Sequence, residues 1–152
     1  MADELTAKIV FPSSDAVKIR TGESINFKGA VASCDSPSYS WSFGDSGIED
    51  SDKEDPGDVT FPTAGVYEVT FTVTDGEEKT DNASVTVTVC PPGDINGNGK
   101  VEMTDAILIL QILAGTEGTD PNNIHSAADV NDDDQIGMVE VIYILRKLSG
   151  SK

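Results

Sequence analysis

The hydrophobic pattern of the chain changes once, close to residue 90. Before that point apolar side chains alternate with polar ones, the period of a half-buried β-strand. The alternating stretches are rich in β-branched and aromatic residues and cover 7–11, 24–28, 39–43, 67–73 and 84–89. Turns rich in Gly, Pro and Asp separate them. Roughly seven short strands at such spacing predict a β-sandwich over 1–90.

Beyond residue 93 the apolar period becomes helical. Residues 104–114 and 139–148 each predict a helix with a broad apolar face, ended by Gly115 and Gly150 respectively. The segment 120–128 can form a short helix between them, with its proline in the first turn.

Pro91, Pro92 and Gly93 break both patterns and predict a short, semi-rigid linker over 91–93. The sequence therefore predicts two domains, all-β over 1–90 and small all-α over 94–152.

Two twelve-residue runs, one before each helix, have the spacing of an EF-hand calcium loop. The first, 94–105, has oxygen-bearing side chains at positions 1, 3, 5, 9 and 12, a glycine at 6 and an apolar residue at 8. The second, 129–140, repeats the pattern 35 residues later, and the apolar positions of the helices recur at the same offset. The second half of the chain is therefore a duplication of a loop–helix unit.

Composition narrows the function classes. The net charge is −17, with 27 acids against 10 bases, which disfavours nucleic acids and anionic membranes as partners. No apolar run reaches the ~18 residues of a membrane-spanning helix. The start, Met1-Ala-Asp-Glu, lacks the features of a signal peptide, so we expect a fragment of a longer protein. Two cysteines and His125 are too few for a zinc site, and no motif predicts an active site.

Two features of the first domain leave alternatives open. Trp41 lies in mid-strand and suits a sandwich core, while the alternative is an exposed platform for sugars. The acidic run 50–55 suits a solvated loop, while the alternative is a third calcium site that includes Asp45.

The first domain resembles the PKD (polycystic kidney disease) domain. The run from Trp41 to Ser46 reads Trp-Ser-Phe-Gly-Asp-Ser, and 64–69 and 73–75 continue the resemblance. It implies an immunoglobulin-like sandwich and an extracellular or cell-surface location. In that topology Cys34 and Cys90 fall near opposite poles, beyond the ~7 Å Cα separation that a disulfide allows, so we expect no bridge between them.

No helix precedes the first loop, because Pro91, Pro92 and Gly93 prevent one, so this arrangement differs from a full EF-hand. The second domain resembles the dockerin domain, whose signature is a pair of loop–helix calcium motifs separated by a linker. The resemblance implies two Ca²⁺ ions and a cohesin-like protein partner. By position, the first ion would be held by Asp94, Asn96, Asn98, the carbonyl of Lys100, Glu102 through water, and Asp105. The second would be held by Asp129, Asn131, Asp133, the carbonyl of Gln135, and Glu140.

Position 6 of the second loop departs from the pattern. A positive φ is expected there, and Asp134 replaces the glycine found as Gly99 in the first loop. We expect this to cost about 1 kcal/mol and both sites still to bind calcium.

The same resemblance places partner recognition at loop positions 10 and 11 and farther along each helix. Those residues are Met103, Thr104, Leu108, Gln111, Met138, Val139, Tyr143, Arg146 and Lys147, arranged with two-fold symmetry by the duplication. The alternative for Met103 and Met138 is packing inside the module or against the sandwich.

The leading hypothesis is a non-catalytic, monomeric module for calcium-dependent docking. The alternatives are a calcium-stabilised structural or adhesive segment without a cohesin partner, and a carbohydrate-binding sandwich.

Overall fold

The computed structural model describes residues 4–116 and 128–150. The short helix expected over 120–128 includes His125. All of this segment except Ala128 lies outside the described residues. The described elements, in chain order, are β1 (Thr6–Phe11), β2 (Ala16–Arg20), β3 (Ser24–Ala32), β4 (Ser38–Ser42), the 3-10 helix η1 (Gly44–Ser46), β5 (Gly57–Thr60), β6 (Gly65–Thr74), β7 (Thr80–Cys90), α1 (Met103–Leu113) and α2 (Met138–Ser149).

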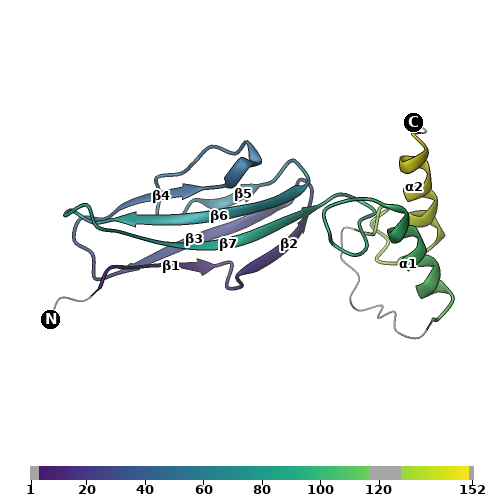
Figure 1. The fold of residues 1–152 in the computed structure, drawn as a ribbon, viewed down its shortest axis with the longest axis horizontal. Coiled ribbons are helices and arrows are strands. Elements are labelled where there is room, and N and C mark those ends of the chain that lie inside the picture. The colour runs from purple at the N-terminus through teal and green to yellow at the C-terminus, as the bar shows by residue number, and fades with distance from the viewer. Residues whose placement is uncertain (1–3, 117–127, 151–152) are drawn as a thin grey trace. The chain divides into compact units, whose positions relative to one another are not determined.

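The seven strands among the described residues form two sheets, in the orders β1-β3-β5 and β2-β7-β6-β4 (Figure 1). The pairs β1–β3, β3–β5 and β4–β6 are antiparallel, and Trp41 lies opposite Phe71 in the last of them. The predicted β-sandwich is therefore confirmed. The alternating stretches became β1, β3, β4, β6 and β7, whereas β2 and β5 are short strands that periodicity alone did not single out.

Aromatic rings fill the centre of the sandwich. Trp41 is fully buried and lies 4.6 Å from Phe71 between ring centroids, and its indole N–H donates to the carbonyl of Glu54 at 3.2 Å. Phe27 and Phe43 lie beside it, Phe61 packs against both of them, and all three are buried. Trp41 is thus a core residue. Of the aromatic side chains that the structure describes, only Phe11 is strongly exposed, which removes the basis for a sugar platform.

The acidic run 50–55 is bound to the sandwich through its backbone. Ser51 exchanges two backbone hydrogen bonds with Trp41, at 2.7 and 3.1 Å. The carbonyl of Glu54 and the carboxylate of Asp55 both accept from the backbone N–H of Gly29. Within the described residues, no three acidic side chains of this run lie together.

The two thiols lie at opposite ends of the sandwich. Cys34 precedes Asp35, whose carbonyl accepts from Gly76 in the β6–β7 turn, whereas Cys90 ends β7 at the other end of that strand. Both are free, and the expected absence of a disulfide between them agrees with this geometry. Burial raises the pKa of the Cys90 thiol to about 12.

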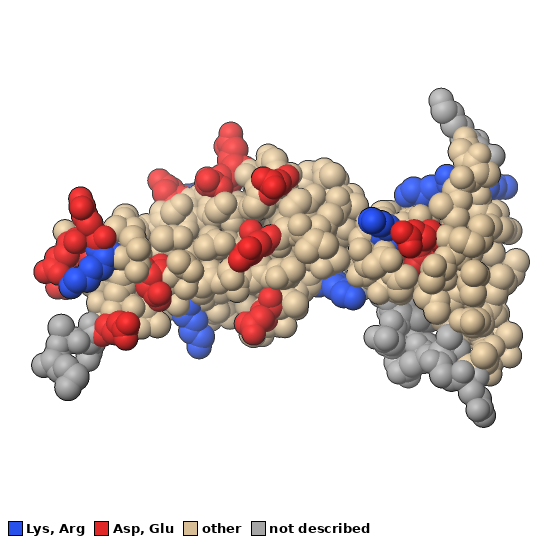
Figure 2. Space-filling model, in the orientation of Figure 1, with Lys and Arg blue, Asp and Glu red and all other residues tan. Residues whose placement is uncertain are grey.

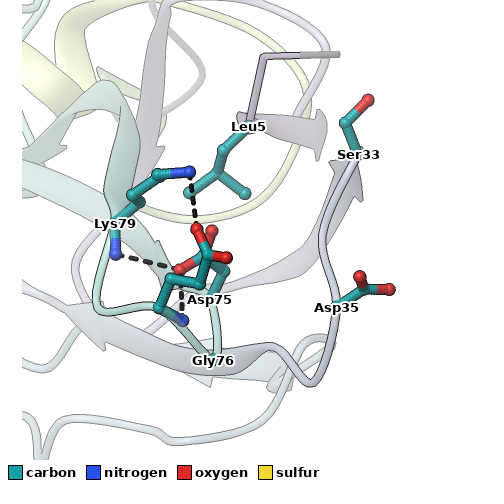
Figure 3. A pocket seen from close by; sticks show the side chains of 7 residues that line it. Leu5, Ser33, Asp35, Asp75, Gly76 and Lys79 are labelled. Carbon is teal, nitrogen blue, oxygen red and sulfur yellow. Dashed lines mark hydrogen bonds and ion pairs between the residues drawn. The ribbon is translucent and has the colours of Figure 1, made fainter. Parts of the chain in front are cut away.

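Acidic side chains are spread over the surface of the sandwich (Figure 2). A hollow of about 210 Å³ at the β6–β7 turn contains three of them, beside Lys79 (Figure 3). Asp75 accepts there from the backbone N–H groups of Glu77 and Lys79, both at 2.9 Å, and Lys79 pairs with Glu77. These charges stabilise the turn.

The chain divides into two compact units, one with most of the sandwich and one with both helices and the end of β7 from Thr88. The helical unit has a small core made of Ile95, Ala106, Ile109, Ala128, Val141 and Ile144. The helices end where glycines adopt left-handed backbone, at Gly115 (φ 65°) and Gly150 (φ 72°), as predicted. No described helix has the length and apolar character needed to span a membrane.

Candidate calcium loops and docking face

The first loop is organised by the buried carboxylate of Asp94. One of its oxygens accepts from the backbone N–H of Asn98 at 3.1 Å and the other from Gly99 at 2.7 Å. Asn96 and Asn98 extend the series, because their side-chain oxygens accept from the backbone N–H groups two residues farther along the chain. The loop is therefore folded around oxygen atoms at positions 1, 3 and 5.

Asp105, at position 12, joins the loop to its helix. One carboxylate oxygen accepts from Glu102 at 2.7 Å, just before α1, and the other from Ile95 at 3.1 Å. The side chain is fully buried. Burial raises the pKa of the Asp105 carboxyl above its ordinary value, although the backbone donors act in the opposite direction.

The second loop repeats this arrangement. Asp129 accepts from Asn131 at 3.2 Å, from Asp132 at 2.8 Å and from Asp134 at 2.8 Å. Asp133 accepts from the backbone of Gln135 and from the side-chain amide of Asn131. Although burial acts to raise the pKa of Asp129, its backbone donors outweigh burial and the pKa is lowered.

Glu140 differs from every other side chain in the described part of the molecule. One oxygen, Oε2, accepts from Gly137 at 2.7 Å, as Asp105 does from Glu102. The other, Oε1, is buried and has no hydrogen-bond partner. A buried carboxylate oxygen without a partner is costly unless a cation or a donor reaches it. This oxygen therefore fits a metal ligand at position 12.

The backbone of the two loops matches at the strained positions. Positive φ occurs at Gly97 (68°) and Gly99 (87°) in the first loop, and at Asp132 (57°) and Asp134 (58°) in the second. The predicted left-handed conformation of Asp134 is confirmed. Sequence reasoning missed the same requirement at position 4, where the glycine of the first loop was the available signal.

The remaining ligand candidates lie in the same loops. Lys100, Glu102, Asn131, Asp133 and Gln135 are all exposed. Within the described residues no three acidic side chains converge on one point. The structure thus places Asp and Asn oxygens against the N–H groups of the loop backbone, with buried acids at the positions that begin and end each loop.

Both helices leave a row of large apolar side chains exposed. On α1 the row is Met103, Ile107, Leu110 and Leu113, and on α2 it is Met138, Ile142, Leu145 and Leu148. Each of these side chains is 43–53% exposed, and the two rows correspond at the 35-residue offset. We call these the α1 row and the α2 row. Of these eight residues, only Met103 and Met138 were predicted from the sequence to contact a partner.

Both domains of the chain match models of known protein families. A family model described as the PKD domain matches residues 11–89, and one described as the dockerin type I domain matches residues 92–149. The chain belongs to the PKD family and continues into a dockerin type I domain. Both resemblances predicted from the sequence are confirmed. Dockerin type I domains bind calcium and bind cohesins, and both families are non-catalytic modules.

Solved structures similar to the chain include the PKD1 domain of Vibrio anguillarum Epp, with 24% identity, 59% of this chain and 96% of that chain covered, and a TM-score of 0.43. The PKD1 domain from the Vibrio cholerae metalloprotease PrtV gives 26% identity, 57% and 91% coverage, and a TM-score of 0.39. Fibronectin(III)-like modules of Clostridium thermocellum CbhA give 17% identity, 55% and 94% coverage, and a TM-score of 0.46. No curated protein sequence matches the chain.

The partner residues predicted on the dockerin domain fall into two groups. Met103, Thr104, Met138, Val139, Arg146 and Lys147 are exposed. Leu108, Gln111 and Tyr143 are half-buried, and Leu108 and Tyr143 pack against the small core. Packing of Met103 and Met138 inside the dockerin domain is not observed, since they are 52% and 53% exposed. Ile107, Leu110, Leu113 and their counterparts were missed as surface residues.

Proposed function

We propose that the chain is a non-catalytic, extracellular module that docks through its dockerin domain onto a cohesin domain in a calcium-dependent manner. The α1 and α2 rows carry this proposal. Among the described residues of the domain, these eight large apolar side chains are exposed and six residues form the buried core, and the same positions are exposed in both repeats. Exposed apolar surface of this extent is typical of a protein-binding face.

The calcium sites proposed in the two loops use the predicted oxygen donors. The first comprises Asp94, Asn96, Asn98, the Lys100 carbonyl, Glu102 through water, and Asp105. The second comprises Asp129, Asn131, Asp133, the Gln135 carbonyl and Glu140. A hard cation suits these all-oxygen sets, and the partnerless Glu140 Oε1 supports a ligand at that position.

Calcium would act on docking through the helices. Asp105 and Glu140 each accept a hydrogen bond from the residue that precedes a helix, so the geometry of position 12 sets where α1 and α2 begin. Met103 and Met138 are the first residues of those helices. An ion held at position 12 would therefore fix the start of both exposed rows.

The PKD domain would serve as a spacer that carries the docking module, in a larger secreted or surface protein. Its buried aromatic centre leaves no row of exposed rings for sugars. A structural segment without a cohesin partner is the competing function, and it predicts that the exposed rows contribute to stability alone.

The test uses the whole chain and purified type I cohesin domains in titration calorimetry, in calcium and in excess EDTA. We expect binding in calcium and none in EDTA. The double variant Leu110→Asp with Leu145→Asp should weaken binding at least tenfold. The matched control is Val66→Asp, an exposed apolar position on the sandwich, which should bind as the unmodified chain does.

Absence of binding to every cohesin in calcium would reject docking in favour of the structural segment. Unchanged binding by the double variant would reject the proposed face. Circular dichroism of each variant in calcium shows whether the helices are retained.

A further inference from the structure

The two repeats of the dockerin domain share their apolar rows but differ beside them. At the 35-residue offset Thr104 corresponds to Val139, Leu108 to Tyr143, Gln111 to Arg146 and Ile112 to Lys147. The last turn of α1 contains no basic residue, whereas that of α2 contains Arg146 and Lys147. The symmetry of the docking face is therefore incomplete.

A groove lies along α2, with a volume of about 410 Å³. Its lining is mainly apolar and is made of Val130, Asn131, Val139, Ile142, Tyr143 and Arg146. Ile142 belongs to the α2 row, so the groove continues that row toward the second calcium loop.

The charge beside this groove is opposite in sign to that of the chain. Arg146 and Lys147 are two of the chain's 10 basic residues, against 27 acids. Lys147 lies over the ring of Tyr143, with its ammonium 5.7 Å from the ring centroid. Neither base forms an ion pair with another residue in the described part of the chain. Figure 2 shows basic side chains over the region of α2.

From this juxtaposition we infer that the α2 groove receives an apolar side chain of the partner protein with an acidic side chain next to it, so that the partner docks preferentially on α2. The groove would hold the apolar group against Ile142 and Tyr143, and Arg146 would pair with the carboxylate. Helix α1 offers the apolar row but no basic residue in its last turn. This inference rests on the proposed docking function and specifies the partner chemistry.

Arg146→Glu tests the inference, in the full chain with calcium and a cohesin domain that binds the unmodified protein. We expect the dissociation constant to rise at least tenfold. Gln111→Glu places the same residue at the corresponding position of α1 but changes the charge by one unit instead of two. Its effect should be clearly smaller than that of Arg146→Gln, which also changes the charge by one unit. Lys53→Glu makes the same two-unit change as Arg146→Glu on an exposed sandwich position and should leave binding unchanged.

A charge exchange identifies the pairing. Acidic residues on the bound cohesin face are replaced one at a time by lysine, and one of these variants should recover binding by Arg146→Glu. Last-turn cations also stabilise a helix, so helical circular dichroism is measured for each variant. Arg146→Gln, with an intact helix and reduced binding, separates pairing from stability.

Three outcomes would overturn the inference. Equal losses for Arg146→Glu and Gln111→Glu would mean that both repeats serve alike. Recovery by none of the cohesin variants would exclude the carboxylate. If the chain alone forms a dimer in sedimentation experiments and Arg146→Glu abolishes that dimer, the occupant of the α2 groove is a second copy of the chain. Failure of the unmodified chain to bind any cohesin would instead reject the docking function itself.

Discussion

The two halves of this molecule bury different chemistry. The sandwich places aromatic rings at its centre, and Trp41, Phe27 and Phe71 have no exposed surface. The dockerin domain has a core of short aliphatic residues and buries four carboxylates, those of Asp94, Asp105, Asp129 and Glu140. A sandwich of this kind is stabilised by the burial of apolar side chains. The stability of a small module with buried carboxylates depends instead on the groups that compensate their negative charge.

The largest effect expected from this difference is that of calcium removal. Excess EDTA should unfold the dockerin domain and leave the PKD domain folded, because only the former holds buried carboxylates in its loops. Helical circular dichroism at 222 nm reports unfolding of the dockerin domain. Fluorescence of Trp41, the chain's single tryptophan, reports whether the PKD domain stays folded. Helical signal retained in EDTA would contradict the comparison, as would a shift in Trp41 emission.

The reverse experiment removes the aromatic centre of the sandwich. Trp41→Ala should destabilise the PKD domain by about 3–5 kcal/mol, through the lost burial and the cavity left among Phe27, Phe43 and Phe71. Urea unfolding followed by near-UV circular dichroism measures this. The calcium-dependent helical signal should be unchanged, and Trp41→Phe should cost less. A loss in both domains would show that they fold as one unit.

Close packing in the sandwich can be tested at Gly29 in β3. A methyl group there would overlap the ring of Phe71 and the carbonyl of Glu54. Gly29→Ala should therefore destabilise the PKD domain by about 1–3 kcal/mol, because the ring and the loop over it must both move. Ser40→Ala, at an exposed position of β4, is the control for urea unfolding and should change little. A neutral Gly29→Ala would mean that the ring shifts freely.

The sequence pattern predicted different kinds of features in the two halves. Alternation located five strands, because one face of each is buried and the period of two is visible in the residues. It did not single out β5, whose Gly57 and Asp58 are common in turns, or the short β2. Loop spacing located both calcium motifs, since the ligand positions are fixed by the path of twelve residues.

The sequence pattern did not predict which apolar residues of the helices are buried. Residues 106–110 of α1 are all apolar, so the sequence alone cannot say which of them face the core. The structure buries Ala106 and Ile109 and exposes Ile107 and Leu110, because the partner helix covers only one side. Likewise, the positive φ of Asp132 could be inferred only by reading the two repeats against each other, with Gly97 as the guide.

The smallest predicted effect concerns the backbone of the two loops. Asp134→Gly should stabilise the calcium-loaded dockerin domain by up to about 1 kcal/mol, because glycine adopts the observed φ of 58° without steric cost. The greater freedom of glycine in the unfolded chain offsets part of this gain. Thermal unfolding of the helical signal at fixed calcium concentration measures it.

Gly99→Ala is the reciprocal variant and isolates the backbone term. A Cβ atom at Gly99 would meet no other atom within 4 Å, so the φ of 87° is the only obstacle to alanine there. We expect a destabilisation of about 1 kcal/mol, opposite in sign to that of Asp134→Gly. Equal signs would mean that the Asp134 carboxylate, through its charge beside the loop, contributes more than its backbone conformation costs.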